Sequence, residues 1–162
     1  MVSEGEKVPD VKLMRAGADG PEPVSTGELF GHGRSVLFAV PGAYTPTCSA
    51  RHLPGYVEHA DGFRAKGVDR IVCTSVNDAF VMGAWAQASG VGTSGDDIVM
   101  LADGNAEFAN AMGLSMDGSG YGMGTRSQRY AAVIEDGVVR QLLVEEGGGF
   151  GVSSAEEVLS RL

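Results

Sequence analysis

The chain has 162 residues, of which 43% are hydrophobic and 20% charged, and its net charge is −9. This length predicts one domain, residues 1–162, with enough apolar side chains to bury a core. The acidic balance argues against nucleic-acid binding, which needs Lys and Arg side chains to neutralise phosphates. The sequence also contains no apolar run of about 18 residues, so we expect no membrane span.

The N-terminal half alternates between short apolar runs and helical patterns. The polar, acidic segment "MVSEGEKVPD" lacks the regions of a signal peptide, so we expect a cytoplasmic location. Continuous, β-branched runs predict buried strands. These predicted strands cover residues 35–40, 69–76 and 98–103.

Helical patterns lie between and after these runs. The first predicted helix, 49–67, has an irregularity at Pro54 and a glycine stop at Gly67. The next two cover 78–90, capped by Asn77 or Asp78, and 105–113, closed by a glycine.

The C-terminal third predicts a hairpin and a last helix. Residues 130–145 read as two strands around a Glu-Asp-Gly turn, and 153–162 as a helix with a Ser cap and Glu157 in a capping box. The element order predicts an α/β fold with a mixed central sheet flanked by helices. The glycine-rich segment 113–128 is a long connection, and connections of this length often carry function.

Cys48, one of two cysteines, lies at a predicted helix entrance. Thr45 suits the N-cap and Pro46 the first helical position, which puts Cys48 in the first turn. Unpaired backbone N–H groups and the helix dipole favour a thiolate there. The site also follows the carboxyl end of the 35–40 strand, where α/β sheets place their chemistry. A small buried hydrophobic residue is the other interpretation that the cysteine alone allows.

Other residues give weaker signals. His52 lies four positions after Cys48 on the same helical face, so a Cys-His hydrolase is an alternative, although no orienting partner is evident. We expect Trp85 to pack near the pocket. Residues 145–151 lack the Lys-Ser/Thr of a P-loop and read as a flexible loop. The spacing of Cys and His residues predicts no metal site, and we expect no cofactor.

A family resemblance rests on several separated motifs. "PGAYTPTC" (41–48) has the form P-x-x-x-T-x-x-C, and the wider "FAVPGAYTPTCSARHLPGY", "VNDAFVMGAW" and "RSQRYAAVIEDG" agree with it in order and spacing. The chain resembles the type II, or fifth mammalian class, peroxiredoxins from about residue 5 onward. This resemblance implies a thioredoxin-like fold with extra N-terminal elements and a thiol peroxidase activity.

The resemblance also implies residue roles. The Cys48 thiolate would attack a peroxide O–O bond and become a sulfenic acid. Thr45 would hydrogen-bond the peroxide and the thiolate, Pro41 would shield the thiolate from water, and Arg129 would keep it ionised. Arg126, three residues earlier, fits the pattern less well because the arginine of the family directly precedes an aromatic residue.

The second half of the cycle has several possible forms. The region "GFGVSSAEE", where some relatives carry a resolving cysteine, has none, and Cys73 is predicted inside a strand. We therefore expect a one-cysteine cycle in which glutathione, glutaredoxin or thioredoxin reduces the sulfenic acid. Hydrogen peroxide and alkyl hydroperoxides are the expected substrates, and a homodimer is expected. A redox sensor that passes oxidation from Cys48 to a partner protein is an alternative.

Overall fold

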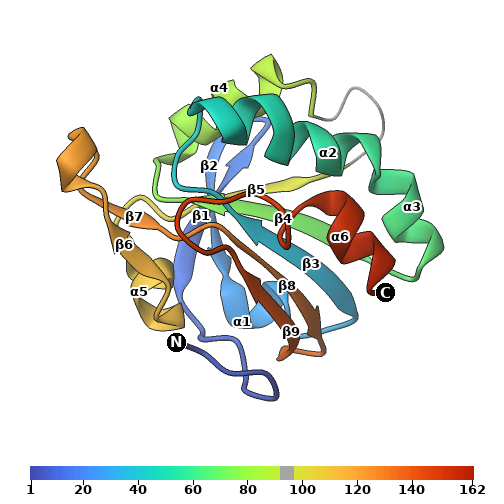
Figure 1. The fold of residues 1–162 in the computed structure, drawn as a ribbon. Helices are drawn as coiled ribbons and strands as arrows, with labels where there is room; N and C mark the ends of the chain where they lie inside the picture. Colours follow the sequence, from blue (N-terminus) through green and yellow to red (C-terminus); the bar gives the residue numbers. More distant parts are fainter. Residues whose placement is uncertain (92–96) are drawn as a thin grey trace.

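A seven-stranded sheet forms the centre of the computed structural model, which describes residues 1–91 and 97–162 (Figure 1). The strand order is β2-β1-β5-β4-β3-β8-β9, in which β3, β4 and β5 are parallel neighbours and the other pairs are antiparallel. The sheet is therefore mixed, as predicted. Its strands are β1 (Lys12–Gly17), β2 (Gly20–Ser25), β3 (Arg34–Ala39), β4 (Arg70–Ser75), β5 (Val99–Ala102), β8 (Tyr130–Glu135) and β9 (Val138–Val144).

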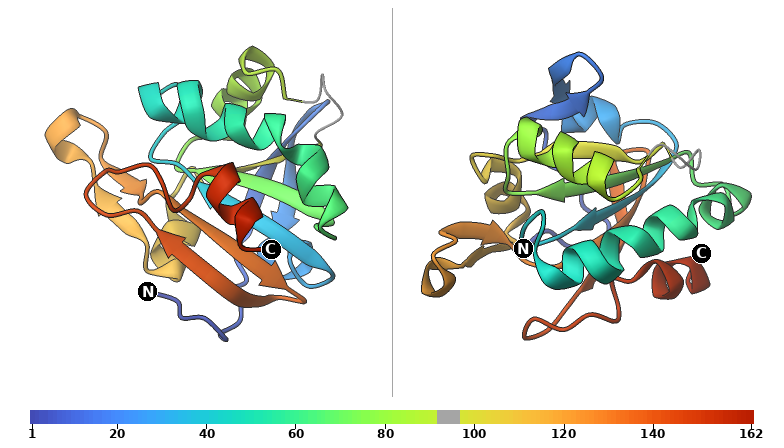
Figure 2. Two further views of the ribbon diagram at one scale, coloured as in Figure 1. Left: turned by 45° about the vertical axis from the view of Figure 1, so that its right-hand side comes forward. Right: turned by 90° about the horizontal axis from the view of Figure 1, so that it is seen from above.

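Helices cover both faces of this sheet. α2, α3, α4 and α6 pack on one face, and α1 and α5 on the other (Figure 2). The strand β3 serves both cores, because Val36 and Phe38 face the first group while Leu37 and Ala39 face the second. The helices are α1 (Thr26–Leu29), α2 (Leu53–Glu58), α3 (Ala60–Ala65), α4 (Ala79–Ala88), α5 (Glu107–Met112) and α6 (Ala155–Ser160).

The helix predicted over 49–67 is broken into three pieces. A π-helical turn, η1 (Cys48–His52), precedes α2, and a break at His59 separates α2 from α3. Pro54 accounts for the π turn. It has no N–H for the carbonyl four residues earlier, and its ring would clash with that carbonyl. The N–H of Leu53 bonds instead to the carbonyl five residues earlier, at the start of the turn.

The other predicted elements are confirmed with small shifts at their ends. Asp78 caps α4 by accepting from the N–H of Val81, and Ser154 caps α6 by accepting from the N–H of Glu157. The turn between β8 and β9 holds Asp136 and Gly137 at φ of 48° and 81°. Such positive φ values favour Asp and Gly, which is why this dipeptide marks the hairpin.

The expected N-terminal extension is a β1–β2 hairpin followed by α1. One structured part differs from the sequence prediction. The segment 113–128, predicted as a connection, contains a small antiparallel sheet of β6 (Ser115–Asp117) and β7 (Thr125–Ser127), joined through η2 (Ser119–Tyr121). This arm projects from the body of the molecule in Figure 1. Among the helices in the described part of the chain, none has the length and apolar character that a membrane crossing requires.

Candidate active site

The strand β3 leads into a turn and then into the helix entrance that carries Cys48. Helical backbone begins at Pro46, and the Thr45 carbonyl accepts from the N–H of Ser49 at 3.0 Å. Thr45 therefore occupies the predicted N-cap position, and Cys48 is the third helical residue. Tyr44, just before the cap, has a φ of 64°, which is uncommon for a residue other than glycine and often marks a functional turn.

The side chain of Thr45 contacts the Cys48 sulfur rather than capping the helix. Its Oγ1 lies 2.8 Å from Cys48 Sγ and 2.7 Å from the Gly42 carbonyl oxygen. A hydroxyl has one proton to donate. When Cys48 is a thiolate, that proton is best placed on the sulfur. When Cys48 is a thiol, the hydroxyl can accept from S–H and donate to Gly42.

Arg129 supplies a second donor to the same sulfur. It directly precedes β8 and follows the side-chain alternation of Ala131 and Val133, which lie in the apolar cluster that contains Cys48. Arg129 Nη2 donates to Cys48 Sγ at 3.1 Å, and the side chain is buried. A buried guanidinium needs a compensating charge or acceptors, and a thiolate at this position supplies one.

His52 is buried beside Arg129 and contacts it directly. Its Nδ1 lies 2.7 Å from Arg129 Nη1, and its Nε2 lies 3.0 Å from the Ser153 carbonyl oxygen. Burial, together with the nearby Arg129 charge, lowers the pKa of His52 to about 3. The Nδ1 lone pair faces a guanidinium and not the thiol, so His52 is not placed to deprotonate Cys48. This geometry argues against the Cys-His hydrolase.

The other two predicted residues lie close by. Pro41 and Arg129 line one pocket together with residues of the 145–148 segment. Arg126 binds elsewhere: its Nε donates to the Met123 carbonyl at 2.8 Å and its Nη1 to the Val76 carbonyl at 3.0 Å. Arg126 thereby ties the β6–β7 arm to the end of β4, whereas Arg129 contacts the sulfur.

Cys73 lies in β4, and its side chain points to the face of the sheet that the Cys48 helix covers. The sequence alone does not determine this face. Cys73 pairs in register with Phe38 of β3 and belongs to the same apolar cluster as Cys48. Both thiols are free and buried, and burial raises the pKa of Cys73 well above its ordinary value. Cys73 therefore lies buried inside a strand of the core, as predicted.

Sequence reasoning missed two residues of the segment 145–151. Glu145 Oε2 accepts from the backbone N–H groups of Gly151 at 2.6 Å and Ser153 at 2.9 Å. The Phe150 ring packs edge-on against His52, with ring centroids 5.1 Å apart, and lies under the Arg51 guanidinium at 4.6 Å. A single aromatic residue among glycines, following a carboxylate at a strand end, was the available signal.

Trp85 reaches the site from α4. It is buried, and its Nε1 donates to the hydroxyl of Ser49, the residue after Cys48, at 2.9 Å. Since it is the chain's single tryptophan, its fluorescence reports on the helix entrance.

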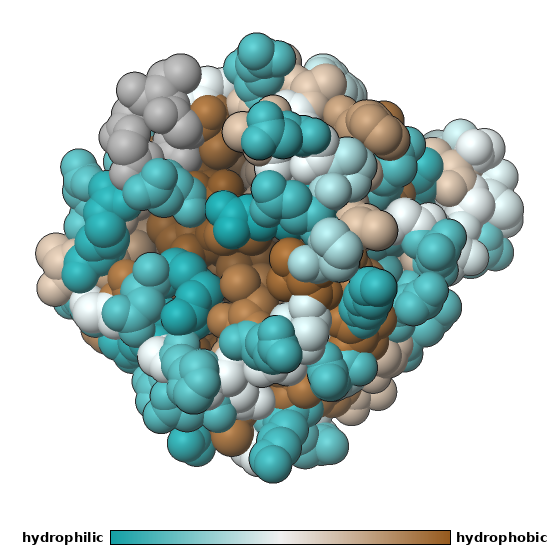
Figure 3. Space-filling view, turned by 180° about the vertical axis from the view of Figure 1, so that it is seen from behind, coloured by the Kyte–Doolittle hydropathy of each residue, from teal (hydrophilic) through white to brown (hydrophobic). Residues whose placement is uncertain are grey.

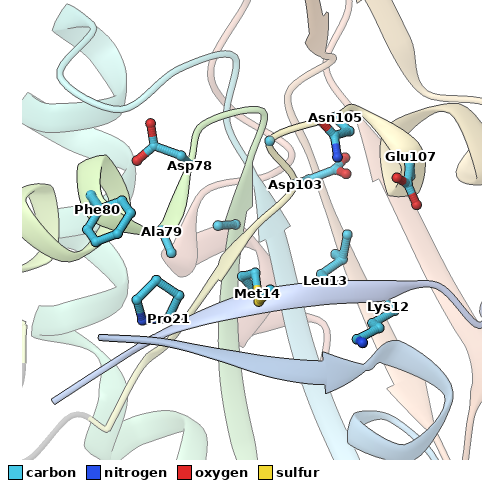
Figure 4. A pocket seen from close by; sticks show the side chains of 12 residues that line it. Lys12, Leu13, Met14, Pro21, Asp78, Ala79, Phe80, Asp103, Asn105 and Glu107 are labelled. Atoms are coloured by element: carbon cyan, nitrogen blue, oxygen red, sulfur yellow. The ribbon is translucent and has the colours of Figure 1, made fainter. Parts of the chain in front are cut away.

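A separate pocket opens between the β1–β2 hairpin, β5 and the starts of α4 and α5 (Figure 4). Its lining is mostly apolar and includes Phe80, whose exposed fraction is 73%, and it contains none of the residues around the Cys48 sulfur. The face of the molecule seen in Figure 3 has a recessed hydrophobic area ringed by hydrophilic side chains. Within residues 1–91 and 97–162, no group of three or more His, Cys, Asp and Glu side chains is arranged to hold a metal ion.

Comparison with known proteins adds family evidence. The Redoxin family profile matches residues 3–159. The chain is 51% identical to "Peroxiredoxin-2E-2, chloroplastic" of Oryza sativa subsp. japonica, a match that covers 99% of this chain and 72% of that protein. It is 41% identical to "Hybrid peroxiredoxin hyPrx5" of Haemophilus influenzae, over 98% of this chain and 66% of that protein. The solved structure of reduced Prx3 from Vibrio vulnificus in complex with hydrogen peroxide has 49% identity and a TM-score of 0.93, and the match covers 99% of each chain.

Proposed function

The chain belongs to the type II peroxiredoxins, a family of thiol peroxidases with a thioredoxin-like fold, and on that premise we propose that Cys48 is the thiol that peroxide oxidises. Thr45, Arg129 and Pro41 are its proposed catalytic partners. The observation that carries this assignment is the convergence of Thr45 Oγ1 and Arg129 Nη2 on one buried sulfur at a helix entrance.

The proposed first step oxidises the sulfur by two electrons. The Cys48 thiolate attacks one peroxide oxygen, an S–O bond forms and the O–O bond breaks. The departing oxygen leaves as hydroxide or alkoxide, takes a proton and becomes water or an alcohol. The Arg129 guanidinium and the Thr45 hydroxyl stabilise the charge that develops on these oxygens.

Substrate access supports a small peroxide. Cys48 has no exposed surface, whereas Pro41 and Arg129 both line a pocket. We propose that the peroxide enters there, with Pro41 keeping water away from the thiolate. Hydrogen peroxide and alkyl hydroperoxides are the proposed substrates; the relative from Vibrio vulnificus was solved with hydrogen peroxide.

The proposed second step uses an external thiol. A thiolate of glutathione, glutaredoxin or thioredoxin attacks the Cys48 sulfenic acid, so that a mixed disulfide forms, the S–O bond breaks and hydroxide leaves and takes a proton to become water. A second thiol then releases reduced Cys48. The burial of Cys73 inside β4 supports this one-cysteine cycle.

Stopped-flow mixing of the reduced protein with hydrogen peroxide, followed by Trp85 fluorescence, tests the assignment. We expect a fast second-order change in wild type and none in Cys48→Ser, whose steady-state peroxidase activity should also be lost. Cys73→Ser is the matched control, since it also removes one buried thiol. Activity above a few per cent of wild type in Cys48→Ser would overturn the assignment.

The remaining predictions concern the whole chain. We propose that residues 1–162 fold as one redoxin domain.

We also propose that two copies of the chain form a homodimer. The exposed aromatic side chains of Phe80 and Tyr121 support a dimer surface. Sedimentation equilibrium of wild type against Phe80→Ser tests this. The cytoplasmic location stays a prediction.

A further inference from the structure

A continuous set of hydrogen bonds links the 145–153 loop to the Cys48 sulfur. Glu145 accepts from the N–H and the hydroxyl of Ser153, and the Ser153 carbonyl accepts from His52. His52 contacts Arg129, and Arg129 donates to Cys48. Apart from the half-buried Glu145, every residue of this set is buried, so water does not substitute for its contacts.

The contacts of His52 define one tautomer. Arginine nitrogens only donate, so the 2.7 Å contact requires His52 Nδ1 to accept from Arg129 Nη1. The proton of the neutral ring must then lie on Nε2, which faces the Ser153 carbonyl at 3.0 Å. The other tautomer would turn an N–H toward Arg129 and leave a lone pair facing a carbonyl oxygen.

The Ser153 carbonyl is itself held in place. It also accepts from the Tyr56 hydroxyl at 2.7 Å. Glu145 Oε2 also holds the loop, because it accepts from the Ser153 hydroxyl at 2.7 Å and from the N–H of Gly151 at 2.6 Å. Phe150, which lies between Glu145 and Gly151 in the chain, packs its ring edge-on against the imidazole.

We propose that His52 is a positioning residue for Arg129, and that the 145–153 loop, closed by Glu145, fixes the tautomer that lets His52 accept from Arg129. This inference rests on the proposed roles of Cys48 and Arg129 and adds the part that orients the guanidinium. With Nη1 held by His52, Nη2 points at the sulfur. Without an acceptor at Nδ1, the guanidinium is free to rotate away from it.

Two substitutions of His52 separate positioning from packing. In His52→Asn the side-chain oxygen can occupy the place of Nδ1 and accept from Arg129, but nothing reaches Ser153. In His52→Gln the longer amide can donate to Ser153 but leaves no acceptor near Nδ1. Gln fills more of the cavity than Asn, so packing alone predicts the reverse order of activity.

The test measures the second-order rate of peroxide reaction in both variants. We expect His52→Asn to stay within about threefold of wild type and His52→Gln to fall by about 10- to 100-fold, the range for a lost hydrogen bond to a charged group. Equal rates in the two variants, or a faster His52→Gln, would overturn the inference. Whatever the result for the two His52 variants, the peroxide rates of Cys48→Ser and Arg129→Gln test the proposed roles of those two residues separately.

A double-mutant cycle tests the loop without touching the buried ring. Glu145→Gln weakens the hold on Ser153, and we expect it to slow the reaction severalfold in wild type and to have no effect in an Arg129→Gln background. A merely structural effect would be equal in the two backgrounds, and that result would contradict the role of the loop. Glu146→Gln, at the exposed neighbouring residue, is the matched control.

Discussion

At the residue scale, the hydroxyl of Thr45 has one proton and two acceptors within reach. The bond to the Gly42 carbonyl keeps the side chain aimed at Cys48 even when the sulfur is protonated. The space around Gly42 is crowded. A Cβ at Gly42 would lie 3.1 Å from the Thr45 methyl and 3.3 Å from Arg126 Nη1, so only glycine fits without displacing them.

Thr45→Val removes this hydroxyl and keeps the backbone carbonyl that starts the helix. We expect peroxide attack to slow by about 10²-fold, the usual cost of one lost transition-state donor, with little change in melting temperature. Thr47→Val, in the same turn and without a capping hydrogen bond, is the control and should react normally. Unchanged kinetics in Thr45→Val would show that Thr45 has only a backbone role.

The two arginines allow a second paired comparison. Arg129→Gln removes a charged donor beside the sulfur, so we expect a peroxide reaction slower by about 10²-fold. Arg126→Gln removes the tie between the arm and β4 and should stay within about threefold of wild type. Stopped-flow measurement of the second-order peroxide rate in each variant tests both expectations. A larger effect from Arg126 would reverse the assignment.

At the scale of elements, the relation of the Cys48 helix to β4 bears on the proposed route of reduction. A disulfide needs Cα atoms within about 7 Å of each other, and Cys73 is fixed in the middle of a central strand. We expect that bonding the two thiols requires the helix around residues 47–52 to unwind.

We accordingly expect Cys73→Ser to keep most of its peroxidase activity when glutathione or glutaredoxin is supplied. Without reductant, peroxide should leave Cys48 as sulfenic or sulfinic acid, which mass spectrometry detects. A dominant Cys48–Cys73 disulfide peptide, with an inactive Cys73→Ser variant, would instead make Cys73 the resolving thiol.

Most elements could be predicted because their signals are local. Continuous apolar runs identify β3, β4 and β5, and Asp78 and Ser154 cap their helices through residues only three positions away. The π turn was not predictable in this way, because Pro54 predicts an irregularity but not the wider turn before it. The partners of His52 are 77 and 101 residues away, so only the folded chain brings them together.

At the scale of the whole molecule, the buried His52 makes the free energy of unfolding depend on pH. Its pKa falls from an ordinary 6.5 to about 3 in the folded chain, so below pH 6.5 the unfolded chain binds a proton that the folded chain excludes. The contribution of neutral His52 to the free energy of unfolding is therefore fully present above pH 6.5 and is lost as pH falls toward 3. At pH 4.5 this loss is about 2–3 kcal/mol.

Urea unfolding at pH 7 and pH 4.5 checks this contribution. Between the two pH values we expect wild type to lose about 2–3 kcal/mol more than His52→Asn, which lacks the titrating ring. Part-burial raises the pKa of Glu145, but hydrogen bonds from Gly151 and Ser153 lower it by more, so its contribution is lost at lower pH and is common to both proteins. Equal losses in the two proteins would contradict the neutral, buried state of His52.

The π turn at Cys48–His52 also predicts a rate of amide hydrogen exchange. Its bond from Leu53 N–H spans five residues in a wide turn, whereas the following turn of α2 has ordinary α-helical bonds. Amides of the π turn should therefore exchange with solvent deuterium sooner than those of α2, through brief openings much smaller than global unfolding. Under the proposed one-cysteine cycle, the lifetime of these openings would set how long the oxidised sulfur is exposed to a bulky thiol protein.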